Sequence, residues 1–166
     1  TSLDGSSHTF VRLRIDDIIL EATNEMNRRF KDFQFSITIK ESLEDEHLIV
    51  QGNELLLKTD FYNLLENGYK YTEDHKVKVE ILDVGKNISV IVTDKGIGIP
   101  NDELELITNP FFRAQNAQIK KGQGLGLTIV ENIIQLHRGT MSIKSSLNKG
   151  SVFTVTLPVA NASGIG

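Results

Sequence analysis

Two runs of alternating apolar residues, joined by a short turn at Gly85, constrain the fold of this 166-residue chain more than any other feature. Residues two apart in a strand point to the same face of a sheet, so each run presents one apolar face. The spacing predicts an antiparallel hairpin of two long strands. Such a hairpin is stable only when its apolar face packs against another layer, which the rest of the chain has to supply. The apolar positions are Val77, Val79 and Ile81, then Ile88, Val90 and Val92.

The remaining pattern alternates strands with helices. Asp16 or Asp17 is the expected N-cap of a first helix, and Asn53 that of a long second helix. Residues 47–51 are expected to form a partner strand for residues 35–39. Strands in pairs with helices between them predict an α/β fold in which helices cover one face of a sheet. We expect strands at residues 10–15, 35–39, 47–51, 140–146 and 151–157, and helices at residues 16–30, 54–71 and 125–137.

Size and composition indicate one folded domain over residues 10–158, with a linker at 1–9 and a tail at 159–166. The absence of cysteine excludes disulfides and thiolate metal sites. A formal net charge of −4 makes nucleic acid an unsuitable partner. No apolar stretch approaches the roughly 18 residues of a membrane span, and no secretion signal is present. We therefore expect a cytoplasmic domain without direct membrane contact.

One face of the second helix carries a row of polar groups. Amide oxygens are suitable ligands for Mg²⁺, which also binds through substrate phosphates, and a lysine adds positive charge for those phosphates. A solvated helix face produces the same pattern, so this segment alone leaves both interpretations open. The polar residues recur at i, i+4, i+7 and i+8, within an arc of roughly 100°, and are Asn63, Asn67, Lys70 and Tyr71. The neighbouring arc, expected to face the core, holds Leu57, Phe61, Leu64 and Leu65.

The second strand of the hairpin runs through Asp94 into two glycines, Gly96 and Gly98. Glycines have no side chain to prevent the backbone from approaching a ligand. A carboxylate here is able to accept a hydrogen bond from the exocyclic amine of adenine, whereas guanine presents an oxygen acceptor at that position. The site would then select ATP over GTP. An Asp-Gly turn after a strand explains the same residues without any ligand.

Three alternating glycines open the third helix, in Lys120-Lys-Gly-Gln-Gly-Leu-Gly-Leu127. Backbone N–H groups at a helix start hold phosphate oxygens, helped by the helix dipole and by flanking lysines. The pattern is neither that of a dinucleotide fold nor that of a phosphate loop, and a purely structural glycine turn is the alternative.

A polar segment at residues 107–119 precedes this glycine loop, and Phe111 and Phe112 anchor it. Such a segment is suited to close over a nucleotide as a lid, with Arg113 near the terminal phosphate. The alternative is a surface loop beside two core phenylalanines.

Taken in order, these segments resemble the catalytic domain of sensor histidine kinases in the GHKL superfamily, which also holds gyrase, a heat-shock chaperone and mismatch-repair ATPases. The resemblance covers residues 10–158. It implies a two-layer α/β sandwich with a mixed sheet of about five strands, about three helices on one face, and ATP under a mobile lid. The four motifs are Asn63-Leu-Leu-Glu-Asn67 with Lys70-Tyr71, Asp94-Lys-Gly-Ile-Gly98, Pro110-Phe-Phe-Arg113 and Gly122-Gln-Gly-Leu-Gly-Leu127.

Carried over by position, the resemblance makes Asn63 the Mg²⁺ ligand and gives Asn67, Lys70 and Arg113 roles at the phosphates. It makes Asp94 the adenine reader, places Tyr71 against the nucleoside, and has Ser151 support Asp94 through a water. The other implied ATP contacts are Gly96, Gly98 and Ile99 around the base, and Lys121, Gly122, Gly124, Leu125, Gly126 and Leu127 around the phosphates.

Two positions depart from the family pattern. Gly68 replaces a more usual alanine, which costs roughly 0.5–1 kcal/mol within a helix. Asn109 stands beside Pro110, where relatives often have an acidic residue.

In the gyrase-like branch the position of Asn63 resembles a glutamate that activates water, and an amide is unable to accept that proton. We therefore expect phosphoryl transfer to a histidine on a separate domain rather than hydrolysis. The resemblance implies phosphoacceptor helices before Thr1, a dimer through them, and a downstream response regulator. Two alternatives remain, a GHKL-type ATPase module and a non-catalytic nucleotide-binding signalling module.

None of the chain's own histidines suits the acceptor role. His137 ends the third helix, where a positive partner for the helix dipole is the expected explanation. The other histidines lie in polar stretches or at the start of an expected strand, and are His8, His47 and His75.

Overall fold

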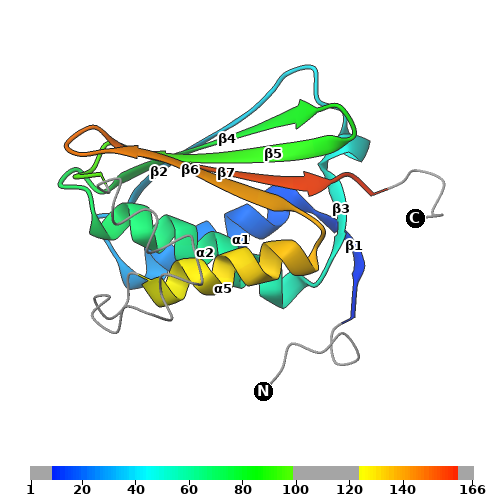
Figure 1. The fold of residues 1–166 in the computed structure, drawn as a ribbon, viewed down its shortest axis with the longest axis horizontal. Coiled ribbons are helices and arrows are strands. Elements are labelled where there is room, and N and C mark those ends of the chain that lie inside the picture. Colours follow the sequence, from blue (N-terminus) through cyan, green and yellow to red (C-terminus); the bar gives the residue numbers. More distant parts are fainter. Residues whose placement is uncertain (1–8, 99–123, 161–166) are drawn as a thin grey trace.

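The computed structural model describes residues 9–98 and 124–160, which form two layers (Figure 1). One layer is a five-stranded sheet in the order β2-β4-β5-β7-β6, and the other consists of α1, α2 and α5 beneath one face of that sheet. β2 (Gln34–Ile39) pairs in parallel with β4 (Lys76–Val84). The other neighbouring strands, β5 (Asn87–Asp94), β7 (Gly150–Pro158) and β6 (Thr140–Ser146), pair antiparallel. The predicted α/β sandwich with a mixed sheet is confirmed.

The β4–β5 hairpin lies at the centre of this sheet, as its apolar pattern predicts. Val79 stands opposite Val92, and Ile81 opposite Val90. Each of these side chains is at most 2% exposed. The alternation therefore directs one apolar row onto the helices, and the polar row faces the uncovered side of the sheet.

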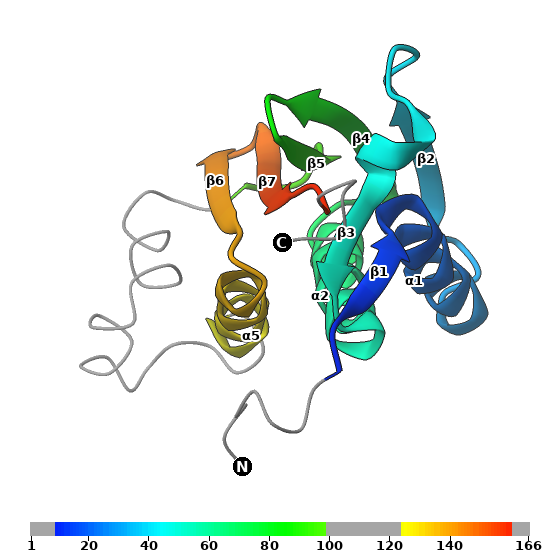
Figure 2. The same ribbon diagram turned by 90° about the vertical axis from the view of Figure 1, so that its right-hand side faces the viewer.

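A second, smaller sheet pairs β1 (Val11–Arg14) with β3 (Ile49–Gly52), and β1 lies beside α1 (Figure 2). The prediction that residues 47–51 pair with residues 35–39 is wrong, because β2 pairs with β4 instead. A short 3-10 helix, η2 (Asp45–Leu48), turns the chain away, so His47 lies outside the strand. The four residues of β3 are too few for their pattern of apolar and polar side chains to specify which strand β3 pairs with.

Three helices cover the sheet: α1 (Ile15–Arg29), α2 (Glu54–Lys70) and α5 (Gly124–Leu136). Asn53 caps α2 as predicted, because its Oδ1 accepts the backbone N–H of Leu56 at 3.0 Å. The predicted cap of α1 is wrong. The N-cap residue is Arg14, whose side chain makes no cap hydrogen bond, and Asp16 lies in the first turn, where it pairs with the Arg14 guanidinium at 3.0 Å.

The first residues of the expected tail belong to the fold. Val159 bridges to Val50, and the backbone N–H of Ala160 donates to the carbonyl of Ile49 at 2.8 Å. This contact joins the end of β7 to the small sheet. Within residues 9–98 and 124–160, no helix is long and apolar enough to cross a membrane.

Candidate functional site

The predicted polar row lies on α2, over its last two turns. Asn63 and Asn67 are half-buried, whereas Lys70 is exposed. Within the part of the chain that the structure describes, neither amide has a hydrogen-bond partner. Amide oxygens are hard ligands, so these two side chains are able to hold Mg²⁺ and a phosphate group.

Asp94 ends β5 as a buried carboxyl group, 5% exposed. Its Oδ1 accepts the backbone N–H of Gly96 at 3.0 Å. Burial raises the pKa of this carboxyl above its ordinary value, while the backbone N–H groups of Gly96 and Ser151 oppose that rise. Desolvation and partial hydrogen bonding leave a strong acceptor in a place that excludes most water.

Glycine is required at two positions after Asp94, because the backbone of neighbouring segments lies close to them. A Cβ on Gly96 would come 2.0 Å from the carbonyl oxygen of Tyr71. One on Gly98, whose φ is +73°, would come 1.9 Å from the carbonyl oxygen of Ser146. The neighbouring backbone of the protein occupies the space that a side chain would need.

At Gly68, α2 packs against the strands that carry Val77 and Asp94. A Cβ on Gly68 would come 2.8 Å from Val77 Cγ2 and 3.7 Å from Asp94 Cβ. The helix therefore lies directly on β4 and β5 at this point. Since Asn67 immediately precedes Gly68, the amide row and the carboxylate belong to the same end of the molecule.

The glycine loop leads into α5, which packs against α2. Gly124, Leu125 and Gly126 form the first turn of α5, and Leu127 follows them as a buried core residue, 4% exposed. The buried position of Leu127 indicates a structural role at the helix entry. Four predicted site residues lie outside the described residues: Ile99, Arg113, Lys121 and Gly122.

Ser151 and Tyr71 both lie against the Asp94 loop. Ser151 stands opposite Asp94 in the β5–β7 pairing, and its hydroxyl lies 2.7 Å from that of Ser145. Tyr71 is the C-cap residue of α2, and its carbonyl accepts the N–H of Ile97 at 3.0 Å. These residues come from three segments: Asn67 and Tyr71 from the end of α2, Asp94 from the end of β5, and Ser151 from the start of β7.

Residues 52–161 match the family of histidine kinase-, DNA gyrase B- and HSP90-like ATPases. This chain belongs to that family. The matched range includes α2, the β4–β5 hairpin, α5 and the last two strands, which are the elements that carry the candidate site.

Curated relatives of this ATPase-family domain are sensor kinases. It is 33% identical over 149 residues to the adaptive-response sensory kinase SasA of Gloeothece citriformis, covering 89% of this chain and 37% of that one. It is 34% identical over 147 residues to the sensor-like histidine kinase SenX3 of Mycolicibacterium smegmatis, covering 87% and 38%. The domain therefore spans little more than a third of the relatives that it matches.

Solved structures of histidine kinases share the fold. The catalytic domain of histidine kinase ThkA superposes with a TM-score of 0.73 at 28% identity, covering 90% of this chain and 97% of that one. Full-length ShkA in complex with AMPPNP gives a TM-score of 0.75 at 22% identity over 93% of this chain and 32% of that one. Because its identity is only 22%, the superposition on ShkA supports a shared fold and nothing more.

The ATPase-family domain also holds a buried carboxyl group on α2 that no sequence motif indicates. Asp60 lies on α2 seven residues before Asn67, and so on the same helix face. It is 1% exposed, and neither carboxyl oxygen has a hydrogen-bond partner among the described residues. Burial raises its pKa to about 9, so the group is protonated at neutral pH. The seven-residue spacing from Asn67 was the available sequence signal.

Lys70 forms an ion pair within α2. Its Nζ lies 3.2 Å from Glu66 Oε1, one turn earlier on α2. The other oxygen of Glu66 accepts from Tyr62 and from Arg29 of α1. The lysine therefore stands in a network that ties α2 to α1.

The expected role of His137 as a positive partner for the helix dipole is wrong. Its Nδ1 donates to the carbonyl of Ile133 at 2.7 Å, and its Nε2 accepts the backbone N–H of Asn53 at 3.0 Å. An accepting Nε2 requires the neutral imidazole, and burial lowers the pKa of the ring. Phe10 stacks on this ring at 4.7 Å between centroids. His137 therefore fastens the end of α5 to the start of α2 and to the entering strand.

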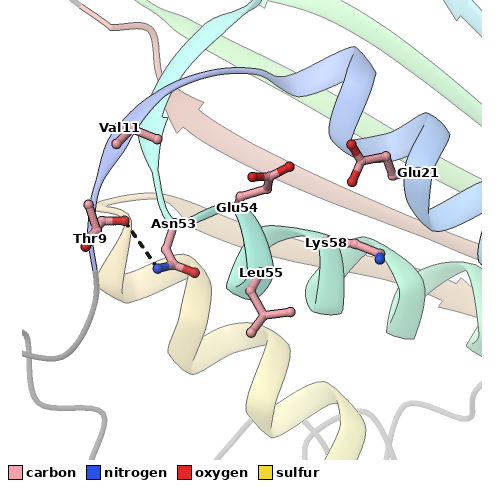
Figure 3. Close-up of a pocket in the computed structure, with 7 residues that line it drawn as sticks. All are labelled: Thr9, Val11, Glu21, Asn53, Glu54, Leu55 and Lys58. Carbon is pink, nitrogen blue, oxygen red and sulfur yellow. Dashed lines mark hydrogen bonds between the residues drawn. The ribbon is translucent and has the colours of Figure 1, made fainter.

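A hollow of about 460 Å³ lies at this end of α2, away from Asp94 (Figure 3). Its walls come from the entering strand, α1 and the first turns of α2, and they include Val11, Glu21 and Leu55. The Asn53 side chain closes one side by donating to the carbonyl of Thr9 at 3.2 Å. Among the residues that the structure describes, none of the predicted nucleotide contacts lines this hollow.

Proposed function

We propose that this domain binds Mg-ATP and transfers its γ-phosphate to a histidine on a separate domain, in two-component signalling. The observation that carries the proposal is the meeting of α2 and β5 at Gly68, which brings the amide row to the end of the molecule that holds the buried Asp94. A base-reading carboxylate and a phosphate-binding helix face are the two ends of one nucleotide site.

In this proposal each group has one task. Asp94 accepts a hydrogen bond from the adenine amine, and Tyr71 lies against the nucleoside. Asn63 holds Mg²⁺, while Asn67 and Lys70 contact the phosphates, with Arg113 acting from the lid. When bound, Mg²⁺ neutralises charge on the phosphate oxygens. Positioning and charge stabilisation are the main requirements of phosphoryl transfer, so these groups suffice without a covalent intermediate.

Asp60 supports transfer to a protein acceptor over hydrolysis of ATP. Hydrolysis needs a base that takes a proton from water. Position 63 is an amide, and the carboxyl of Asp60 on the same face is buried and protonated at neutral pH. Neither group is able to act as that base.

The full-length kinase that contains this domain provides the test. Incubation with Mg-ATP should produce acid-labile phosphohistidine, and Asn67→Ala should lower its rate of formation by about a hundredfold, as expected when positioning at the phosphates is lost. Asn87→Ala, at the far end of β5, is the matched control and should leave the rate unchanged. Steady release of phosphate by the isolated domain, without an acceptor, would instead support a hydrolytic module.

A further inference from the structure

A hollow of about 390 Å³ lies at the end of the sheet where β2 and β4 begin and β5 ends, and most of the side chains that line it are on the face away from the helices. Three lysines line it: Lys76 and Lys78 from β4, and Lys95 immediately after β5. Ser36 of β2 and Thr93 of β5 add hydroxyl groups. We call this feature the lysine hollow.

Strand register brings these groups together. Ser36 pairs with Lys78, and Lys78 pairs with Thr93, so the three form one row across β2, β4 and β5. Lys76 and Lys78 are exposed on either side of the buried Val77. Because alternate side chains in a strand point to opposite faces, both lysines lie on the face opposite the helices. Lys95 is also exposed, one residue beyond the pairing of Val77 with Asp94.

Three lysines and two aspartates line the lysine hollow, so its lining has a formal charge of +1, although the whole chain carries a formal charge of −4. Lys78 pairs with Glu80 at 3.3 Å. Lys76 and Lys95 have no ion-pair partner in the ranges 9–98 and 124–160. Two carboxyl groups also line the hollow, but both have other contacts: Asp74 accepts the backbone N–H of Lys76 at 3.0 Å, and Asp94 accepts that of Gly96.

We propose that the lysine hollow binds a small phosphate-bearing ligand, at a site separate from the nucleotide pocket. Its volume is that of a small-ligand site. Free ammonium groups bind phosphate as point charges, and neighbouring hydroxyl groups donate further hydrogen bonds. Asp94 lines the hollow, but its Cβ lies against Gly68 of α2, on the face of the sheet that the helices cover, and the polar row of the nucleotide site is on α2 itself. The two ligands therefore have room to bind together.

Amide NMR with inorganic pyrophosphate as the probe tests this proposal. The domain is first saturated with an unhydrolysable ATP analogue and Mg²⁺, so that the nucleotide pocket is filled. Pyrophosphate should then give saturable shifts at Ser36, Lys78 and Thr93. The double variant Lys76→Ser/Lys95→Ser should weaken its binding by about tenfold or more, because two charge-assisted contacts are lost.

The control Lys31→Ser/Lys86→Ser removes the same charge from two exposed lysines outside the lysine hollow. It should leave pyrophosphate affinity unchanged. Equal weakening by both double variants would mean a general charge effect and would overturn the proposal. The proposal would also be overturned if pyrophosphate shifted only the signals of Asn63 and Asn67. Binding of an acidic peptide without any binding of pyrophosphate would overturn it as well. Spectra of both variants without ligand establish that each is folded.

Discussion

Two buried carboxyl groups, Asp60 and Asp94, share a cause of pKa elevation but differ in their surroundings. Burial raises the pKa of each. Asp94 retains backbone N–H donors from Gly96 and Ser151, whereas both oxygens of Asp60 lack partners among the described residues. A buried polar group without hydrogen bonds destabilises a fold unless it serves a ligand. In the protein without a ligand, the unpaired Asp60 therefore lowers stability, whereas the hydrogen bonds of Asp94 offset part of the cost of its burial.

Replacing Asp60 with valine should stabilise the domain at neutral pH. An unfolded Asp ionises near pH 3.8, whereas folded Asp60 keeps its proton up to a pKa of about 9. Its stability contribution is therefore complete below pH 3.8 and falls as the pH rises towards 9. Asp60→Val should raise the free energy of unfolding by about 1–4 kcal/mol at pH 7.

Urea denaturation at two pH values measures this effect. The difference between Asp60→Val and wild type should be large at pH 7 and small at pH 4. The control Asp17→Val changes an exposed carboxyl on α1 and should show no such pH dependence. A variant that is less stable than wild type at pH 7 would show that Asp60 has a stabilising partner.

Gly96 provides a second prediction at the level of single residues. Gly96→Ala places a Cβ 2.0 Å from the Tyr71 carbonyl oxygen, so the loop after Asp94 has to move. We expect a loss of about 3 kcal/mol in the free energy of unfolding and weaker nucleotide binding. Gly85→Ala is the control, because its Cβ would meet nothing within 4 Å and only its φ of +62° opposes the change. Its cost should be about 1 kcal/mol.

At the level of elements, α5 connects the two ends of the domain. It begins at the glycine loop, and beyond its end His137 bonds to Asn53 and stacks on Phe10. The sequence places Phe10 and His137 far apart and gives no signal that they meet. The local sequence indicated that His137 is a charged histidine at a helix end, because a local pattern does not show that distant residues bury it.

His137→Leu should lower the free energy of unfolding at pH 7.5 by about 1–3 kcal/mol, since two hydrogen bonds are lost. The pH dependence has a definite sign. Burial lowers the pKa of folded His137 below 6.5, so the stability it contributes is complete above pH 6.5 and is lost as the pH falls below that value.

Thermal unfolding between pH 5 and pH 7.5 checks this dependence. Wild type should lose stability on acidification more steeply than His137→Leu. His47→Leu, in the exposed η2 turn, should follow wild type. Parallel curves for wild type and His137→Leu would contradict the neutral, buried assignment.

At the scale of the whole molecule, hydrophobic alternation predicted the central hairpin, and the order of strands and helices predicted a sheet with helices on one face. Alternation did not identify the partner of β3, since four residues specify no register. The helical spacing of Asn63 and Asn67 placed them on one face of α2. It did not indicate that Gly68 would bring this face onto the strand of Asp94, because that contact depends on tertiary packing.

Titration calorimetry of Mg-ATP into wild type and Asp94→Asn tests the central claim, a nucleotide site read by a buried carboxylate. The lost charged hydrogen bond should weaken binding by about 10- to 100-fold. Asp74→Asn, which neutralises an exposed carboxylate nearby, should bind like wild type. Equal affinity of wild type and a folded Asp94→Asn variant would contradict the account.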